Sequence, residues 1–157
     1  MATRLIYHGT SNRNGVGIML NEMFRNSVTA VDRLSGPLMA VRVDAEEVEL
    51  RVVSAHAAQV GCNEEEKACF WKDLKQYVQS LEGKKVLQIG GDLNEHVDFR
   101  KDGFESCHGA NGYGAPNDDG LRILEYVVAS DLIIANTQCR ERKSHLITYT
   151  SGGREQK

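Results

Sequence analysis

The sequence predicts an α+β fold, built as a single domain whose helices cover the faces of its sheets. Three observations support this class. Strand patterns fill the first third of the chain, two later segments have helical periodicity, and a short apolar strand follows each helix. The chain has 157 residues, which suits one domain, and it contains no internal repeat or linker.

Three strands are predicted in the first third, over residues 16–20, 38–43 and 48–54. In the third of these, apolar residues alternate with charged ones, which is typical of a strand with one buried face. The short polar segment 44–47 separates the last two strands and favours a hairpin between them. These strands are therefore expected to lie in an antiparallel sheet.

The first helix is predicted between Asn63 and Gly83. Asn63 precedes three consecutive glutamates, so it can cap the helix, and Glu66 can complete a capping box. The glutamates also face the positive end of the helix dipole. Apolar residues recur at helical spacing up to Gly83, and the apolar segment 86–89 that follows is predicted as a strand.

A second helix is predicted from residue 117 or 118 to about residue 130, and an apolar strand is predicted over residues 132–135. The segment 99–117 before this helix is rich in Gly, Asn and Asp. A loop of that length inside a compact domain is usually functional or disordered, so we expect one or the other here.

The composition excludes two classes of protein. With 19 Lys plus Arg and 22 Asp plus Glu, the net charge is −3, which excludes a polybasic nucleic-acid tail and a membrane binder held by bulk charge. No apolar stretch reaches the ~20 residues of a membrane span, and the N-terminal residues lack a signal-peptide core. The four cysteines form no CxxC pair and are expected to be free thiols. We therefore expect an intracellular protein, in the nucleus or cytoplasm, without a membrane partner.

The strongest chemical signal follows the predicted strand 86–89, where Asp92 and Asn94 come after two glycines. If the backbone stays extended, both side chains point to one side of the strand. A carboxylate there can bind Mg²⁺ or accept a proton from water, and the amide can donate to an oxyanion. The alternative is an Asx turn that ends the strand, in which the side chains of both residues form hydrogen bonds with nearby backbone groups. The spacing alone favours the turn.

Two further segments offer phosphate contacts. His56 can contact phosphate or relay a proton, although a partly buried histidine is commoner at the end of a strand. The segment 144–151 carries several hydroxyls that can bind phosphate, but Thr and Tyr are also common in strands. The sequence contains no GxxxxGK[ST] motif, which excludes a P-loop nucleotidase, and it has no GxSxG nucleophile elbow.

At these residues the sequence resembles a known family. Residues 86–94 (VLQIGGDLN) are similar to the GDxN motif of the endonuclease/exonuclease/phosphatase superfamily, which has the DNase-I-like fold. Four longer blocks resemble the endonuclease domains of RTE-type (BovB-like) non-LTR retrotransposons: residues 11–18 (SNRNGVGI), 53–61 (VSAHAAQVG), 70–74 (FWKDL) and 144–153 (SHLITYTSGG). Host copies of such domains are often called craniofacial development protein 2-like. The blocks occur in order along nearly the whole chain.

The resemblance implies a two-layer β-sandwich flanked by helices, and Mg²⁺-dependent hydrolysis of a phosphodiester, with Mn²⁺ as a possible substitute and DNA as the expected partner. The family residue at the Asp92 position orients or deprotonates the attacking water, and Asp92 is the metal ligand expected in this chain. Asn94 corresponds to the residue that helps to hold the scissile phosphate. Thr148 belongs to the block that contacts the nucleic-acid backbone.

Two residues depart from the family pattern. His56 stands where most of the family carries a tyrosine that supports the phosphate, and it is expected to donate in its place. Gln88 places an amide in a strand where the family is normally apolar. An unpaired amide in the core would cost about 1–3 kcal/mol.

The resemblance also implies that residues 1–157 are a partial domain, truncated at both ends. The family's metal-binding glutamate lies before the first residue, and its closing aspartate–histidine pair lies beyond Lys157. We therefore expect the hydrolase activity to be impaired or absent. The alternative is a degenerate, non-catalytic domain with weak nucleic-acid or protein binding. A small basic cluster is available for phosphate contact, made of Arg140, Arg142, Lys143 and His145.

Overall fold

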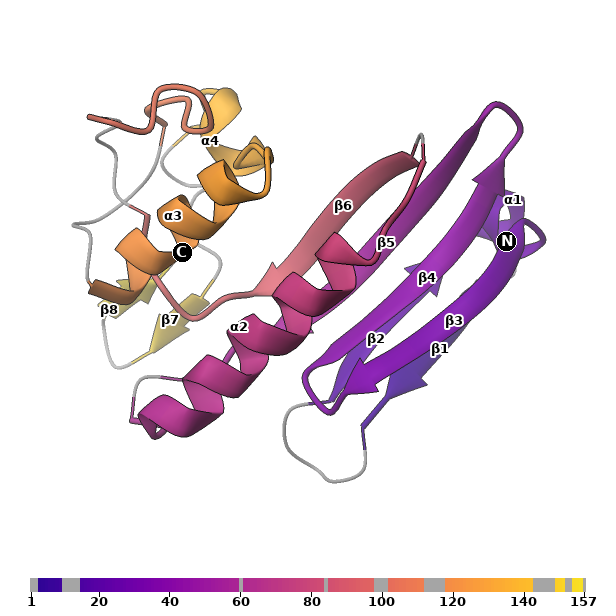
Figure 1. The fold of residues 1–157 in the computed structure, drawn as a ribbon, viewed down its shortest axis with the longest axis horizontal. Helices are drawn as coiled ribbons and strands as arrows, with labels where there is room; N and C mark the ends of the chain where they lie inside the picture. Colours follow the sequence, from indigo (N-terminus) through magenta and orange to yellow (C-terminus); the bar gives the residue numbers. More distant parts are fainter. Residues whose placement is uncertain are drawn as a thin grey trace. The chain divides into compact units, whose positions relative to one another are not determined.

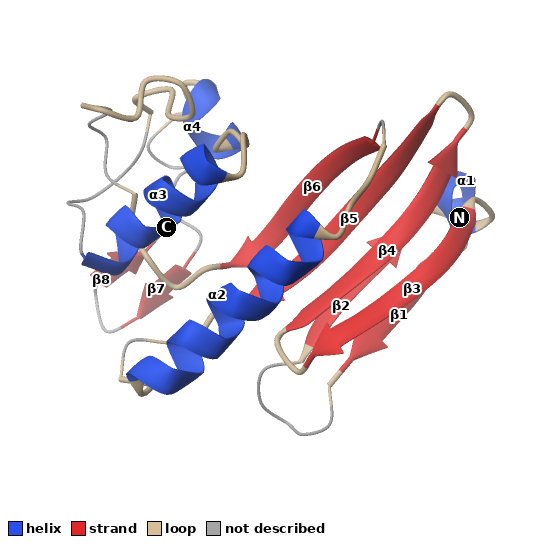
Figure 2. Cartoon of the chain, viewed as in Figure 1, coloured by secondary structure: helices blue, strands red, loops and turns tan. Residues whose placement is uncertain are grey.

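The computed structural model describes residues 3–9, 15–59, 61–83, 85–97, 102–111, 118–142, 149–151 and 154–156. The chain forms two compact units, Met1–Asn94 and Glu95–Lys157. Both contain helices and strands (Figure 2), so the predicted α+β class is confirmed. No helix in these described ranges is long and apolar enough to cross a membrane.

The first unit contains six strands and two helices among its described residues (Figure 1). Their bounds are β1 (Arg4–His8), β2 (Val16–Leu20), α1 (Glu22–Arg25), β3 (Val28–Ser35), β4 (Leu38–Ala45), β5 (Val48–His56), α2 (Glu64–Gln79) and β6 (Lys85–Asp92). Strands β1 and β2 form a two-stranded antiparallel sheet. The second sheet has the order β3-β4-β5-β6, with β3, β4 and β5 antiparallel and β6 parallel to β5.

The connections in this unit follow from local sequence. The predicted hairpin between β4 and β5 is confirmed, with Ala45 paired to Val48 across a turn in which Glu46 has a φ of 59°. The predicted cap is also confirmed, because the Asn63 side chain accepts a hydrogen bond of 2.7 Å from the N–H of Glu66. Helix α2 provides the long crossover that two parallel strands require, here β5 and β6.

The core of the first unit lies between its two sheets. Alternate residues of β2 and β4 are buried there because successive side chains in a strand point to opposite faces. The buried members of this cluster are Ile6, Val16, Ile18, Leu20, Met39, Val41 and Val43. Helix α2 contacts the other face of the larger sheet, where Tyr77 donates a hydrogen bond to Asp32 of β3. Gln88 of β6 is exposed, so its amide carries no burial cost.

The second unit contains α3 (Asp118–Ala129), α4 (Ala135–Gln138), β7 (Tyr149–Ser151) and β8 (Arg154–Gln156), with β7 and β8 antiparallel. The helix predicted from residue 117 or 118 is confirmed as α3. The strand predicted over residues 132–135 is wrong. The N–H of Leu132 donates to the carbonyl of Val127 in α3, and that of Ile134 donates to the carbonyl of Cys107, and these residues pair with no strand in the described part of the chain. Ala135 then begins α4.

The described part of the segment 99–117 is a packed loop. Cys107 and His108 are 1% and 2% exposed, and the N–H of Gly109 donates to the Thr137 hydroxyl at 2.9 Å. Cys107, Gly109 and Asn111 are therefore hydrogen-bonded to α4. The remaining residues of the segment, 98–101 and 112–117, lie outside the described ranges.

Candidate functional site

Strands β5 and β6 bring two of the predicted site residues side by side. Because the strands are parallel, their carboxyl ends meet at one edge of the sheet, and His56 is the register partner of Asp92. The N–H of Ala57 donates to the carbonyl of Asp92 at 2.9 Å, so the pairing continues past the end of β5. The site is therefore built on regular sheet rather than on a free loop.

Gly91 allows the two strand ends to approach closely. Its φ is 142°, a backbone conformation that residues with a side chain rarely adopt. A Cβ atom at this position would overlap the carbonyl oxygen of Ala55 on β5. The second glycine of the GGDLN sequence is thus required by the backbone next to Asp92.

The backbone turns immediately after Asp92. Asn94 has a φ of 57°, and its N–H donates to Asp92 Oδ1 at 2.8 Å. This is the Asx turn that the spacing favoured, so that interpretation is confirmed, and residues 92–94 do not adopt the extended conformation. Because Asn94 is in the left-handed conformation, its side chain does not follow the alternation of a strand. Asp92 and Asn94 are held together by the hydrogen bond of the turn.

The Asn94 side chain links the two strand ends. Its Nδ2 donates to the carbonyl oxygen of Ala57 at 2.7 Å. The Ala57 contact could not be found from the sequence, because it uses a backbone carbonyl and depends on the register between β5 and β6. Asp92, Asn94 and the end of β5 therefore form one connected group.

The group keeps several polar atoms available for chemistry. Asp92 is exposed, and within the described part of the chain its Oδ2 has no hydrogen-bond partner. Asn94 retains its Oδ1 and one N–H, and among the same residues the partly buried His56 imidazole has no hydrogen bond. A carboxylate, an amide and an imidazole at one edge can accept a proton from water and donate to an oxyanion.

The described residues do not form a complete metal site. In the ranges that the structure describes, no group of three or more His, Cys, Asp or Glu side chains lies close enough to hold an ion. Mg²⁺ usually keeps several waters and binds through one or two carboxylates, so Asp92 fits as a partial ligand. Thr148, Lys143 and His145 lie outside the described ranges, and Arg140 and Arg142 are exposed.

Comparisons with known proteins indicate one set of relatives. No protein-family model matches the chain. The chain is 28% identical over 139 residues to craniofacial development protein 2 of Bos taurus and 27% identical over 139 residues to the protein of the same name from Tragulus javanicus. Each alignment covers 88% of this chain, but 23% of the first protein and 24% of the second. The chain is thus homologous to about a quarter of each relative.

Proposed function

We propose that the chain is part of a magnesium-dependent phosphodiesterase domain of the endonuclease/exonuclease/phosphatase superfamily, derived from an RTE-type retrotransposon endonuclease and directed at DNA. The observation that carries the proposal lies at the ends of β5 and β6, where Asp92 and Asn94 are hydrogen-bonded to one another and His56 is the register partner of Asp92. Homology to craniofacial development protein 2 over 88% of the chain supports it, since host copies of such endonuclease domains often bear that name.

Asp92 activates the attacking water in this proposal. Its Oδ2 accepts a hydrogen bond from the water and takes the proton as the nucleophile forms. The bond between its Oδ1 and the N–H of Asn94 fixes the carboxylate, so the second oxygen has a defined orientation. An exposed carboxylate also remains open to a substrate as large as DNA.

Asn94 and His56 hold the phosphate. One amide hydrogen of Asn94 keeps the side chain on the Ala57 carbonyl, and the other donates to a non-bridging phosphate oxygen. The imidazole N–H of His56 donates to the same phosphate group in place of the family's tyrosine. Mg²⁺, or Mn²⁺, held by Asp92 would neutralise negative charge on the phosphate oxygens.

Nicking of supercoiled plasmid DNA tests the proposal. Purified protein with Mg²⁺ is expected to convert supercoiled plasmid slowly to the open circle, and EDTA is expected to stop the conversion. His56→Tyr should retain at least the wild-type rate, because a phenol hydroxyl can donate in the same position. A tenfold or greater fall in this variant, measured on folded protein, would contradict the role given to His56.

A non-catalytic DNA-binding domain is the second candidate. The observation that favours it is the partial ligand set, since the described residues include no cluster of three metal-ligating side chains. Arg140 and Arg142 are exposed and can contact phosphates. Fluorescence anisotropy with a labelled DNA duplex would then detect binding without cleavage. The double variant Arg140→Gln, Arg142→Gln should weaken that binding and reduce its salt dependence.

A further inference from the structure

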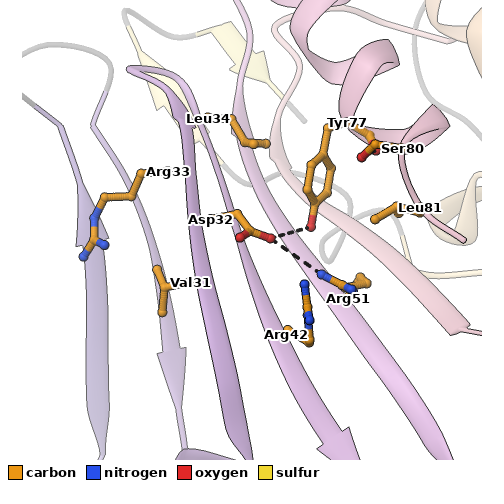
Figure 3. A pocket seen from close by; sticks show the side chains of 9 residues that line it. All are labelled: Val31, Asp32, Arg33, Leu34, Arg42, Arg51, Tyr77, Ser80 and Leu81. Atoms are coloured by element: carbon orange, nitrogen blue, oxygen red, sulfur yellow. Dashed lines mark hydrogen bonds and ion pairs between the residues drawn. The ribbon is translucent and has the colours of Figure 1, made fainter.

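A cavity of about 520 Å³ lies in the first unit, between the larger sheet and the C-terminal end of α2 (Figure 3). Its lining consists of Val31, Asp32, Arg33, Leu34, Arg42, Arg51, Tyr77, Ser80 and Leu81. None of these residues belongs to the group at the strand ends. The volume is in the range of sites that bind small organic molecules, roughly 300–1,000 Å³.

The lining of the cavity contains more basic than acidic residues. Three of its nine residues are arginines and one is an acid. Figure 3 shows the Arg33 side chain extending away from the other polar groups, while Arg42 and Arg51 lie next to one another. These two are direct register partners on β4 and β5. Like charges in such a pair destabilise a sheet unless anions compensate them.

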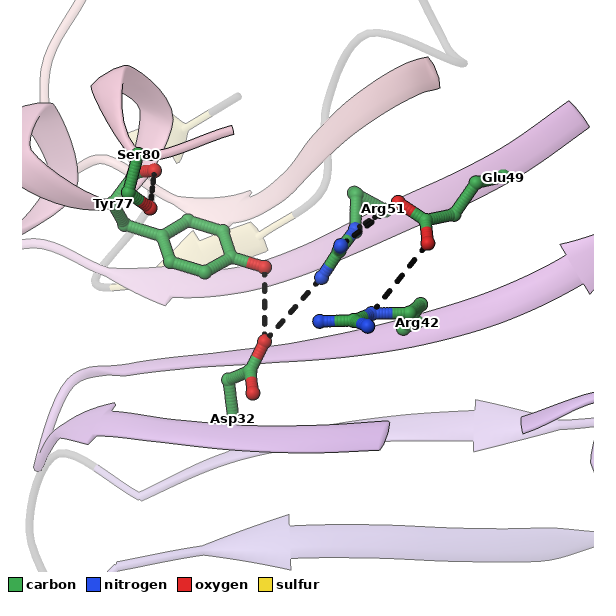
Figure 4. Close-up of polar contacts among 6 residues, drawn as sticks. All are labelled: Asp32, Arg42, Glu49, Arg51, Tyr77 and Ser80. Carbon is green, nitrogen blue, oxygen red and sulfur yellow. Dashed lines mark hydrogen bonds and ion pairs between the residues drawn. The ribbon is translucent and has the colours of Figure 1, made fainter. Parts of the chain in front are cut away.

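Arg51 is fully compensated by protein groups. Its side chain is 7% exposed, and its Nε and Nη2 each lie 2.8 Å from Glu49 Oε1 (Figure 4). Its Nη1 lies 3.6 Å from Asp32 Oδ2, which also accepts a hydrogen bond of 3.3 Å from the Tyr77 hydroxyl. Arg51 is thus paired with both Asp32 and Glu49.

Arg42 is compensated more weakly, by one ion pair with the Glu49 carboxylate that Arg51 already engages. Its Nε is buried without a hydrogen-bond partner, and the carboxylate oxygen that it approaches, Glu49 Oε2, is 3.7 Å away. That distance is too long for a hydrogen bond. Its side chain is 38% exposed at the cavity. A guanidinium presents five N–H donors in a planar fork, and those of Arg42 form no hydrogen bond within the described part of the chain.

We propose that this cavity binds a small organic oxyanion, a phosphate monoester or a carboxylate, with the Arg42 guanidinium as its anchor. The planar fork of Arg42 matches such a group in a bidentate arrangement. The ring of Tyr77 and the side chains of Leu34 and Leu81 provide apolar contacts for the organic body of the ligand. The bound anion would also offset the repulsion between the paired arginines. The site is separate from the proposed phosphodiesterase group and does not depend on it.

Calorimetric titration of the full chain with phenyl phosphate, benzoate and inorganic phosphate tests this site. At least one organic probe should bind with a dissociation constant below about 1 mM, and more tightly than inorganic phosphate because of its apolar contacts. The tighter of the two organic probes identifies the oxyanion as phosphate or carboxylate. Absence of saturable binding by both, to folded wild-type protein, would overturn the proposal.

Two variants with the same charge change locate the binding. Arg42→Gln should weaken it about tenfold or more, since it removes the charge-assisted hydrogen bonds. Arg25→Gln removes an arginine of α1 that contacts Glu22 and Asn26 outside the cavity, so its affinity should equal that of wild type. Equal affinity in wild type and Arg42→Gln would contradict the site. If Arg42→Gln loses helical circular dichroism, Arg42→Lys replaces it and should still weaken binding, because an ammonium lacks the planar fork.

Discussion

Gly91 has a φ of 142° and directly precedes Asp92, at a point where β6 touches the backbone of β5. A larger residue there must move the carbonyl of Ala55, and this carbonyl belongs to the strand that carries His56. The geometry of the candidate site therefore depends on a residue with no chemical role of its own.

Substitution of this glycine has a clear expected result. Gly91→Ala should lower the free energy of unfolding by about 2 kcal/mol or more, because it combines an unfavourable φ with a backbone overlap. Gly90→Ala is the matched control, since a Cβ atom at the neighbouring Gly90 meets nothing within 4 Å. Urea denaturation followed by circular dichroism measures both. Equal stability of the two variants would contradict the close approach of β5 and β6.

At the same scale, the sequence singled out candidate site residues but did not determine all of their geometry. Asp92, Asn94 and His56 were found from motif and position, and the structure places them at one edge. The left-handed backbone of Asn94 and its bond to the Ala57 carbonyl were not predicted. The bond to Ala57 depends on the register between β5 and β6, which local patterns do not encode, whereas the turn at Asn94 is closed by a local hydrogen bond to Asp92.

At the scale of single elements, helix α2 is held to the sheet by polar as well as apolar contacts. Phe70 and Leu74 are buried, and Tyr77 donates to Asp32, which also pairs with Arg51. Burial raises the pKa of the Tyr77 hydroxyl above its ordinary value of 10.0, and the negative charge of Asp32 raises it further. The protonated phenol is therefore favoured in the folded state.

This shift in pKa predicts an alkaline loss of stability. Below about pH 10 the tyrosine is protonated in both states, and its contribution to stability is complete. As the pH rises through the unfolded pKa towards the higher folded value, the unfolded state ionises first and stability falls. Tyr77→Phe removes this term, so between about pH 9 and pH 11 it should lose less stability than wild type. Urea titrations monitored by the fluorescence of Trp71 measure the difference, and identical losses would contradict the prediction.

The elements differ in how far the sequence determines them. Helix α2 and the β4–β5 hairpin carry strong local signals, namely an Asn63 cap and strict alternation next to a short polar turn. The apolar run 132–135 fits a strand or a buried loop equally well by pattern. Hydrogen bonds to α3 and to Cys107 determine its conformation, and the sequence of residues 132–135 does not identify these partners.

At the scale of the first unit, the two sheets share one core, helix α2 covers the other face of the larger sheet, and the β1–β2 sheet exposes its outer face. Met39 of β4 is 0% exposed between the sheets, whereas Met19 of β2 is 69% exposed on the outer face of the β1–β2 sheet. The resemblance to a DNase-I-like sandwich implied this layered arrangement, but composition and periodicity alone led only to an α+β or sandwich-type domain. Composition and periodicity describe local sequence, whereas packing between layers joins residues far apart in the chain, so these local features could not determine the layered arrangement.

A pair of methionine substitutions tests the layering. Met39→Ala should destabilise the unit by about 2–5 kcal/mol, because it removes buried atoms and leaves a cavity between the sheets. Met19→Ala should change stability by less than about 0.5 kcal/mol, since the side chain is already in water. Denaturation monitored by Trp71 fluorescence compares them. A large effect of Met19→Ala, or a negligible one of Met39→Ala, would contradict the assignment of the inner and outer faces.

The central claim is that Asp92 activates water for cleavage of a DNA phosphodiester, and plasmid nicking by matched carboxylate variants tests it most directly. Asp44 is an exposed aspartate of β4 in the same unit, outside the strand-end group, so Asp44→Ala is the control for loss of a carboxylate. We predict Mg²⁺-dependent nicking by wild type and Asp44→Ala, and its loss by a factor of at least about 100 in folded Asp92→Ala. Nicking by Asp92→Ala at the wild-type rate would contradict the claim, and so would an absence of nicking by folded wild-type protein.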